Sequence, residues 1–153
     1  MTGYIMDLRA LVGHRPLLLV GASVIVQDKA GRILLEKRAD NHLWGYAGGS
    51  IELDERAEDA AVRELYEETG LTAKSLTLFN VFSGPDMHYV YPNGDEVSCI
   101  DLLFTCRDYE GTLTAQPDEV EELRFFAPEE LPKPEEFSPP IRRAFYEWLE
   151  KNR

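Results

Sequence analysis

Cysteine is scarce in this chain, with Cys99 and Cys106 the only two among 153 residues. Two cysteines cannot build a disulfide framework or a four-ligand zinc site, so we expect buried thiols in a reducing compartment. Long apolar runs are also lacking, because the longest nearly apolar segment, residues 16–26, is far shorter than the roughly 20 residues that a membrane helix needs. The first apolar stretch contains Asp7 and Arg9, which is untypical of a signal peptide. We therefore predict a cytoplasmic protein without a membrane segment.

Basic residues are few relative to acidic ones, 16 against 28, which gives a net charge of −12. The excess is concentrated in residues 52–68 and 118–136, each of which holds eight acidic and two basic residues. A negative field repels polyanions, so the charge disfavours duplex nucleic acid as a partner. Clustered carboxylates suit hard divalent cations such as magnesium, whereas the alternative for each window is a solvent-exposed acidic surface.

Hydrophobic patterning predicts more strands than helices. The expected strands are residues 17–27, 32–38, 71–82, 88–91, 96–106 and 122–126. Turn residues at 28–31 and 92–95 predict that the first two of these strands, and later the fourth and fifth, pair as hairpins. Residues 47–50 are expected to form a tight backbone passage.

Helices are expected over residues 4–12 within an N-terminal extension (residues 1–16), over residues 55–69 with Asp54 as the cap, and over a closing segment (residues 139–151). The closing helix should turn Phe145, Trp148 and Leu149 inward. The chain is thus expected to be a single α+β domain of residues 1–153, with a mixed, curved β-sheet that carries helices on its faces.

Three carboxylates share one face of the helix expected over residues 55–69. Glu64, Glu67 and Glu68 fall within an arc of about 100°, because successive helical residues advance by 100°. Like-charged pairs at these spacings cost roughly 0.2–0.5 kcal/mol each, and the last turn of a helix favours Lys or Arg. Such violations are expected where function determines the residue, and a divalent cation would relieve the repulsion. A merely exposed acidic helix is the alternative.

Gly48 and Gly49 lie shortly before this helix, and a fixed spacing pattern begins at the second of them. From Gly49 to Leu71 the sequence reads G-x5-E-x7-R-E-L-x-E-E-x-G-L. This matches every fixed position of the Nudix box, so the chain resembles the Nudix hydrolases over residues 49–71. Ala47 stands where the family usually has proline, and the loss of that φ restraint predicts a looser glycine segment.

The resemblance implies an α/β/α sandwich around a mixed sheet. It also implies hydrolysis of a nucleoside diphosphate linked to another moiety, with Mg²⁺ or Mn²⁺ as cofactor. The residues that match the family's metal ligands are the carboxylates of Glu64, Glu67 and Glu68 and the carbonyl of Gly48. Those that match its orienting arginine and the salt-bridge partner of that arginine are Arg63 and Glu55.

Two acidic residues and one basic residue outside the box are further candidates. Glu119 and Glu122 precede an aromatic strand, as a further metal ligand or general base often does in Nudix proteins; a solvated loop is the alternative. Arg38 is a candidate for a substrate phosphate, against a surface salt bridge as the alternative.

Substrate-binding candidates also include a glycine and three aromatic residues. Gly49 permits close approach of the backbone to a ligand. Trp44 is expected either to stack on a base or to fill the core. Tyr89 and Tyr91 are expected either to stack on a nucleobase or to pack across a hairpin.

We expect a small nucleotide as substrate, although the residues leave its identity open. Pro85 and Tyr89 lie at spacings beyond the box that favour ADP-ribose and dinucleoside polyphosphates respectively, and the two indications conflict. The alternatives are a non-catalytic nucleotide-sensing module on the same fold and an RNA 5′-end pyrophosphohydrolase. Ile5, Leu8 and Leu11 have helical spacing and predict packing against the domain or a second copy, so we expect a homodimer.

Overall fold

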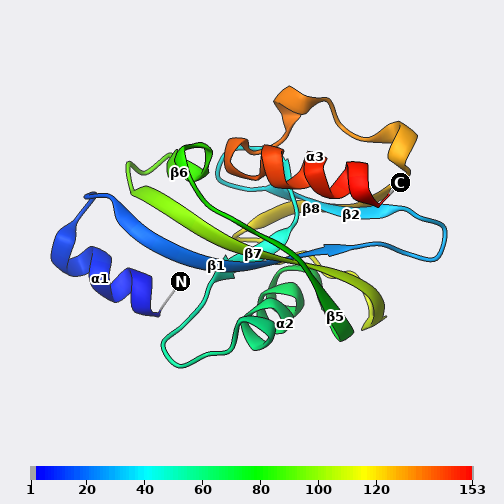
Figure 1. Cartoon of the computed structure of the whole chain (residues 1–153), viewed down its shortest axis with the longest axis horizontal. Helices are drawn as coiled ribbons and strands as arrows, with labels where there is room; N and C mark the ends of the chain where they lie inside the picture. Colours follow the sequence, from blue (N-terminus) through cyan, green and yellow to red (C-terminus); the bar gives the residue numbers. More distant parts are fainter. Residues whose placement is uncertain (1–2, 153) are drawn as a thin grey trace.

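The computed structural model describes residues 3–152 (Figure 1). Residues 1, 2 and 153, which the predicted domain includes, lie outside the described residues. The helices and strands in chain order are α1 (Tyr4–Val12), β1 (Leu17–Val26), β2 (Ile33–Arg38), β3 (Trp44–Gly45), β4 (Ala47–Ser50), α2 (Ala57–Thr69), β5 (Leu71–Phe82), β6 (His88–Val90), β7 (Glu96–Gly111), β8 (Val120–Phe126) and α3 (Arg142–Lys151). Short 3₁₀ turns lie at Pro85–Met87, Pro128–Glu130, Pro134–Glu136 and Pro139–Ile141.

The strands form two sheets. The larger has the order β4-β1-β7-β5, with β6 also paired to β7, and the smaller has the order β3-β2-β8. Strand β1 is parallel to β7 over ten residue pairs from Leu17↔Val97 to Val26↔Cys106, whereas the other ladders are antiparallel. The predicted α+β class with a mixed sheet is therefore confirmed.

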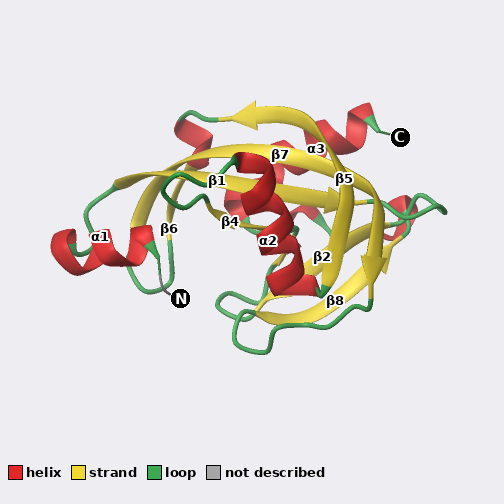
Figure 2. Ribbon diagram, turned by 90° about the horizontal axis from the view of Figure 1, so that it is seen from below, coloured by secondary structure: helices red, strands yellow, loops and turns green. Residues whose placement is uncertain are grey.

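Helices cover both faces of this β-structure, with α3 on one side and α2 on the other (Figures 1 and 2). The two faces alternate along β1, where Ile25 joins the core on the α3 side while Val24 and Val26 join the core on the α2 side. Phe145, Trp148 and Leu149 of α3 are all buried as predicted, and the Trp148 indole donates a hydrogen bond to Thr105 Oγ1 at 2.8 Å. The result is an α/β/α arrangement.

Two predicted backbone features are wrong. The first hairpin does not form, because β4 and β7 take the two edges of β1 and leave only an isolated bridge between Gln27 and Ile33. Residues 47–50 are not a tight passage but strand β4, which pairs with residues 21–24 of β1. The sequence does not reveal either feature, because both depend on which distant strands pair with the edges of β1.

The ends of the helices also differ from the prediction. Helix α2 begins at Ala57 with Arg56 as its N-cap, and Asp54 instead has a left-handed φ of 62° in the preceding turn. The closing helix begins at Arg142, after a 3₁₀ turn. Among residues 3–152, no helix is long and apolar enough to cross a membrane.

The N-terminal helix forms as predicted, but a different residue anchors it. Leu11 is 84% exposed, whereas Arg9 is buried. The Arg9 guanidinium donates to the carbonyls of Gly13, Arg15 and Glu96, at 3.0, 2.6 and 2.6 Å. A buried arginine that satisfies carbonyls of the chain therefore fixes α1 beside β7, while Ile5 and Leu8 of the predicted apolar stripe are half-buried.

Candidate active site

A cavity of about 390 Å³ lies between α1, the glycine strand β4, helix α2 and the inner strands. At one end are four glutamates, which are Glu36, Glu64, Glu68 and Glu119. Residues of α1, including Met6 and Arg9, lie along another part of its wall. The cavity therefore lies beside the acidic face that the sequence predicts for α2.

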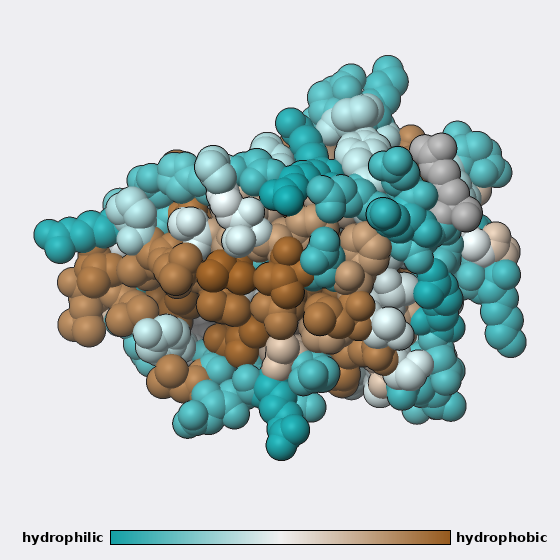
Figure 3. Space-filling view, viewed as in Figure 1, coloured by the Kyte–Doolittle hydropathy of each residue, from teal (hydrophilic) through white to brown (hydrophobic). Residues whose placement is uncertain are grey.

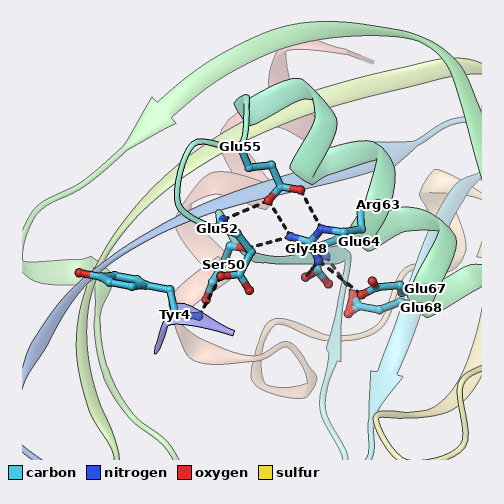
Figure 4. Close-up of polar contacts among 9 residues, drawn as sticks. All are labelled: Tyr4, Gly48, Ser50, Glu52, Glu55, Arg63, Glu64, Glu67 and Glu68. Atoms are coloured by element: carbon cyan, nitrogen blue, oxygen red, sulfur yellow. Dashed lines mark hydrogen bonds and ion pairs between the residues drawn. The ribbon is translucent and has the colours of Figure 1, made fainter. Parts of the chain in front are cut away.

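Glu68 is held against the glycine strand. Its side chain is buried in the last turn of α2, and its Oε1 accepts a hydrogen bond from the Gly48 N–H at 3.0 Å (Figure 4). The N–H and C=O of one residue in a strand point to the same side, so the Gly48 carbonyl is also directed away from β1. The helix and β4 thus bring a carboxylate and a free backbone edge together.

Neither Gly48 nor Gly49 has a left-handed φ, so backbone conformation does not require glycine at these positions. Close packing requires it instead. A Cβ on Gly49 would lie 2.5 Å from the Glu64 carboxyl, and a Cβ on Gly48 would lie 2.4 Å from Ser23 Oγ and 2.9 Å from the Ala22 carbonyl. The predicted close approach of backbone is therefore present, although it brings the strand against α2 and β1.

Arg63 links the loop before α2 to the acidic face (Figure 4). Its guanidinium donates to Glu55 Oε2 and Oε1 at 2.8 and 2.9 Å, to Glu64 Oε1 at 2.8 Å and to the Ser50 carbonyl at 3.1 Å. These bonds hold the pKa of Glu55 below its usual range. The arginine therefore fixes the orientation of Glu64 from the N-terminal side of the helix.

Glu67 occupies a different environment from Glu64 and Glu68. Its side chain is 55% exposed and contacts Arg63 Nη1 at 3.5 Å. Among residues 3–152, no three His, Cys, Asp or Glu side chains are gathered closely enough to hold a metal ion in this structure. The box carboxylates thus share a face as predicted but do not form a closed set of ligands.

Glu36 of β2 belongs to this group although it is not among the residues predicted from the sequence. Its side chain is only 5% exposed and lies within hydrogen-bonding reach of the Glu68 carboxyl. The available signal was a glutamate directly after the apolar residues Ile33, Leu34 and Leu35, in a strand that is buried on both faces.

Burial raises the pKa of three of these carboxyls. Burial, opposed by contact with Glu68 and Arg38, raises the pKa of Glu36 from 4.5 to about 7. Burial and the charge of Glu36 raise the pKa of Glu68 well above 4.5, and burial raises that of Glu64 despite its bond to Arg63. Burial therefore favours the neutral form of these carboxyls, and the charges of neighbouring carboxylates shift their pKa values in the same direction.

The candidates outside the box separate into two places. Glu119 lines the cavity near Glu36 and Glu64, whereas Glu122 lies outside it and forms an ion pair with Arg124. Arg38 also lines the cavity, and its guanidinium donates to both carboxylate oxygens of Asp40, at 2.9 and 2.7 Å. Glu119 and Arg38 therefore join the candidate site, and Glu122 does not.

The aromatic candidates separate in the same way. Trp44 is buried in the core, edge-on to Phe126 with ring centroids 5.0 Å apart. Tyr89 and Tyr91 line the cavity and pack edge-to-face with centroids 5.0 Å apart. Gly49 lines the cavity as well. The structure thus places Trp44 in the core and the two tyrosines in the wall of the cavity.

The donor set suits a hard divalent cation. Carboxylate and carbonyl oxygens are the ligands that Mg²⁺ and Mn²⁺ prefer, and the cationic side chain near Glu36, Arg38, already donates to Asp40. Glu36 Oε1 is also buried without a hydrogen-bond partner among residues 3–152. The residues present therefore fit the metal that the box implies.

The fold and the cavity together define an α/β/α domain with an acidic helix facing a glycine strand. A family model described as the NUDIX domain matches residues 17–149. The chain therefore belongs to the Nudix family, which confirms the identification made from the box.

Similar proteins carry related names. An ADP-ribose pyrophosphatase of Methanocaldococcus jannaschii is 38% identical over 109 residues, which cover 69% of this chain and 60% of that protein. An RNA pyrophosphohydrolase of Actinobacillus pleuropneumoniae is 39% identical over 66 residues, which cover 43% of this chain and 30% of that protein. The chain thus matches at most 60% of the length of these two curated relatives.

Solved structures agree with the fold. A MutT NUDIX hydrolase from Burkholderia pseudomallei superposes with a TM-score of 0.69 at 29% identity, covering 89% of this chain and 97% of that one. A MutT protein from Bacillus halodurans gives 0.68 at 26% identity, covering 89% and 85%.

Proposed function

We propose that this chain hydrolyses the pyrophosphate bond of a nucleoside diphosphate linked to another moiety, and that it requires Mg²⁺ or Mn²⁺. The observation that carries the proposal is the meeting of Glu64 and Glu68 with the glycine strand at one end of a ligand-sized cavity. Pockets of about 300–1,000 Å³ are typical of small-molecule sites.

Each residue has a proposed task. Glu64, Glu68 and the Gly48 carbonyl hold the cation, with Glu67 joining from the exposed side of α2. Arg63, fixed by Glu55, keeps the Glu64 carboxylate directed at the cavity. When bound, the cation neutralises charge on the pyrophosphate oxygens and favours in-line attack by water.

The remaining cavity residues would act on water and on the substrate. Glu119 is the proposed general base, since it is an exposed carboxylate at the acidic end. Arg38 would exchange part of its contact with Asp40 for a phosphate oxygen. Tyr89 and Tyr91 offer aromatic surface to a nucleobase, and Gly49 lets the phosphates approach the backbone.

A substrate screen tests the proposal. The purified chain is incubated with Mg²⁺ or Mn²⁺ and with ADP-ribose, nucleoside triphosphates, sugar nucleotides or dinucleoside polyphosphates, and the released mononucleotides and phosphates are measured. Turnover of at least one class that EDTA abolishes supports the proposal. A folded protein that binds the cation but hydrolyses none of these substrates contradicts it.

An RNA 5′ end is the second candidate substrate, because one relative is named an RNA pyrophosphohydrolase. The net charge of −12 disfavours RNA as a substrate, since RNA binding relies on positive charge. A 5′-triphosphorylated oligonucleotide in the same screen decides between RNA and a free nucleotide. A non-catalytic nucleotide-binding module would bind substrate in the screen without turnover.

We also propose a homodimer in a cytoplasmic setting. Apolar side chains gather over α1 and the neighbouring strands (Figure 3), and Leu11 and Leu18 are 84% and 67% exposed. Exposed apolar patches of this kind are typical of association surfaces. Sedimentation at micromolar concentration tests the dimer, and a single monomeric species contradicts it.

A further inference from the structure

Glu36 is a buried carboxylate in the middle of a paired strand. Strand β2 pairs on one side with β3, where Glu36 faces Gly45, and on the other with β8, where it faces Leu123. Alternate residues point to one face, so Glu36 follows Leu34 on the side that packs beneath α2. The Glu36 side chain is only 5% exposed and lines the cavity.

The surroundings of Glu36 are mostly negative. Glu64, Glu68 and Glu119 face it, and the nearby cation, Arg38, already donates to Asp40. Glu36 Oε1 is buried and accepts no hydrogen bond from any of residues 3–152. A buried polar atom without a partner costs free energy, so its presence calls for an explanation.

Two explanations differ in what Glu36 binds. In the first, its protonated carboxyl donates to Glu68 and merely positions it. That arrangement satisfies the oxygen that carries the proton and leaves Oε1 without a partner. In the second, the carboxylate itself binds a cation, which satisfies the remaining oxygen and relieves the repulsion with Glu64 and Glu68.

We propose that Glu36 is a further ligand of the divalent cation, so that strand β2 and helix α2 hold the ion between them. This inference rests on the proposed metal-dependent function. It adds a ligand that lies outside the box and that comes from the sheet.

Direct metal binding tests this ligand without using turnover. Mn²⁺ binding to the metal-free chain is measured by electron paramagnetic resonance, and Mg²⁺ binding by calorimetry, for wild type, Glu36→Gln and Glu36→Asp. Glu36→Gln keeps a hydrogen-bond donor for Glu68 but loses the charge. We expect it to weaken Mn²⁺ binding by roughly tenfold or more, and Glu36→Asp to weaken binding less.

Glu58→Gln is the matched control. It removes the same charge as Glu36→Gln does, but Glu58 is exposed on the first turn of α2. Its affinity should stay near wild type, and melting of each metal-free variant reports on folding. Wild-type affinity in a folded Glu36→Gln overturns the proposal and leaves Glu36 as a positioning residue. If Glu36→Gln does not fold, unchanged affinity in Glu36→Asp overturns it instead. A wild-type chain that binds neither cation contradicts the proposed function itself.

Discussion

Arg63 and Glu55 are joined by two parallel hydrogen bonds, from Nε to Oε2 at 2.8 Å and from Nη2 to Oε1 at 2.9 Å. Glu55 Oε1 also accepts from the Glu52 N–H at 3.0 Å, so the pair fastens the loop before α2 to the helix. The opposite side of the guanidinium donates to Glu64. One planar side chain therefore connects the loop, the helix and a proposed metal ligand.

Arg63→Lys keeps the charge but removes this planar fork, because an ammonium group cannot make the two parallel bonds. We expect stability to fall by about 1 kcal/mol or less, since the pair is partly exposed, and the affinity for Mg²⁺ to fall by roughly tenfold. Thermal melting and calorimetry measure the two effects. Arg143→Lys, in an exposed ion pair with Asp86 outside the cavity, should leave Mg²⁺ affinity unchanged. If Arg63→Lys and Arg143→Lys bind Mg²⁺ with equal affinity, Arg63 does not orient a metal ligand.

The two glycines should respond differently to a methyl group. In Gly48→Ala the new Cβ meets the Ala22 carbonyl of the backbone at 2.9 Å, so we expect a loss of about 1–3 kcal/mol in stability. In Gly49→Ala the Cβ meets the end of the Glu64 side chain, which is able to move. That variant should lose Mg²⁺ affinity more than stability.

Gly45→Ala is the control for both variants, because its Cβ would meet its nearest neighbour, Ile141 Cγ1, at an ordinary 3.8 Å. Denaturant unfolding and calorimetry on the three proteins separate the effects. A Gly49→Ala variant that binds Mg²⁺ as tightly as Gly45→Ala would show that Glu64 does not depend on close approach to the strand.

How far the sequence predicts this site depends on whether the signal is local. The shared face of Glu64, Glu67 and Glu68 follows from helix geometry alone, and the match to the box gives the family. The place of Glu36 depends on strand pairing between distant segments, which one sequence does not reveal. For the same reason the first hairpin is predicted wrongly, since β4 and β7 pair with the two edges of β1. The single-domain organisation and the residue roles stay predictions.

Asp101 gives a pH dependence whose sign follows from its burial. Burial raises the pKa of Asp101 from 3.8 to about 6, while a hydrogen bond from Ser23 Oγ at 2.7 Å acts in the opposite direction. A raised pKa means that the fold favours the protonated form. Its stabilisation is therefore complete below pH 3.8 and is lost as the pH rises through 6.

Asp101→Asn imitates the protonated form at every pH. Its stability relative to wild type should increase between pH 4 and pH 8, by an amount on the order of 3 kcal/mol. Denaturant unfolding at several pH values in the absence of metal measures this difference. A difference that stays constant with pH would mean that Asp101 has an ordinary pKa in the folded chain.

Glu68→Gln tests the central claim, which is that the carboxylates at the acidic end of the cavity bind a cation and do not stabilise the fold. In the metal-free chain Gln keeps an oxygen for the Gly48 N–H and removes repulsion with Glu36 and Glu64. Stability should therefore be unchanged or higher by some tenths of a kcal/mol. A loss of about 4 kcal/mol of transition-state stabilisation would lower kcat about 1,000-fold.

The decisive measurement is melting temperature, with and without Mg²⁺, together with turnover on one preparation of Glu68→Gln and of wild type. A matched ionic strength of sodium chloride controls for simple screening. The account predicts normal melting without Mg²⁺, loss of most of the Mg²⁺-induced rise and very slow hydrolysis. Lower metal-free stability with near-wild-type turnover per folded molecule would contradict it.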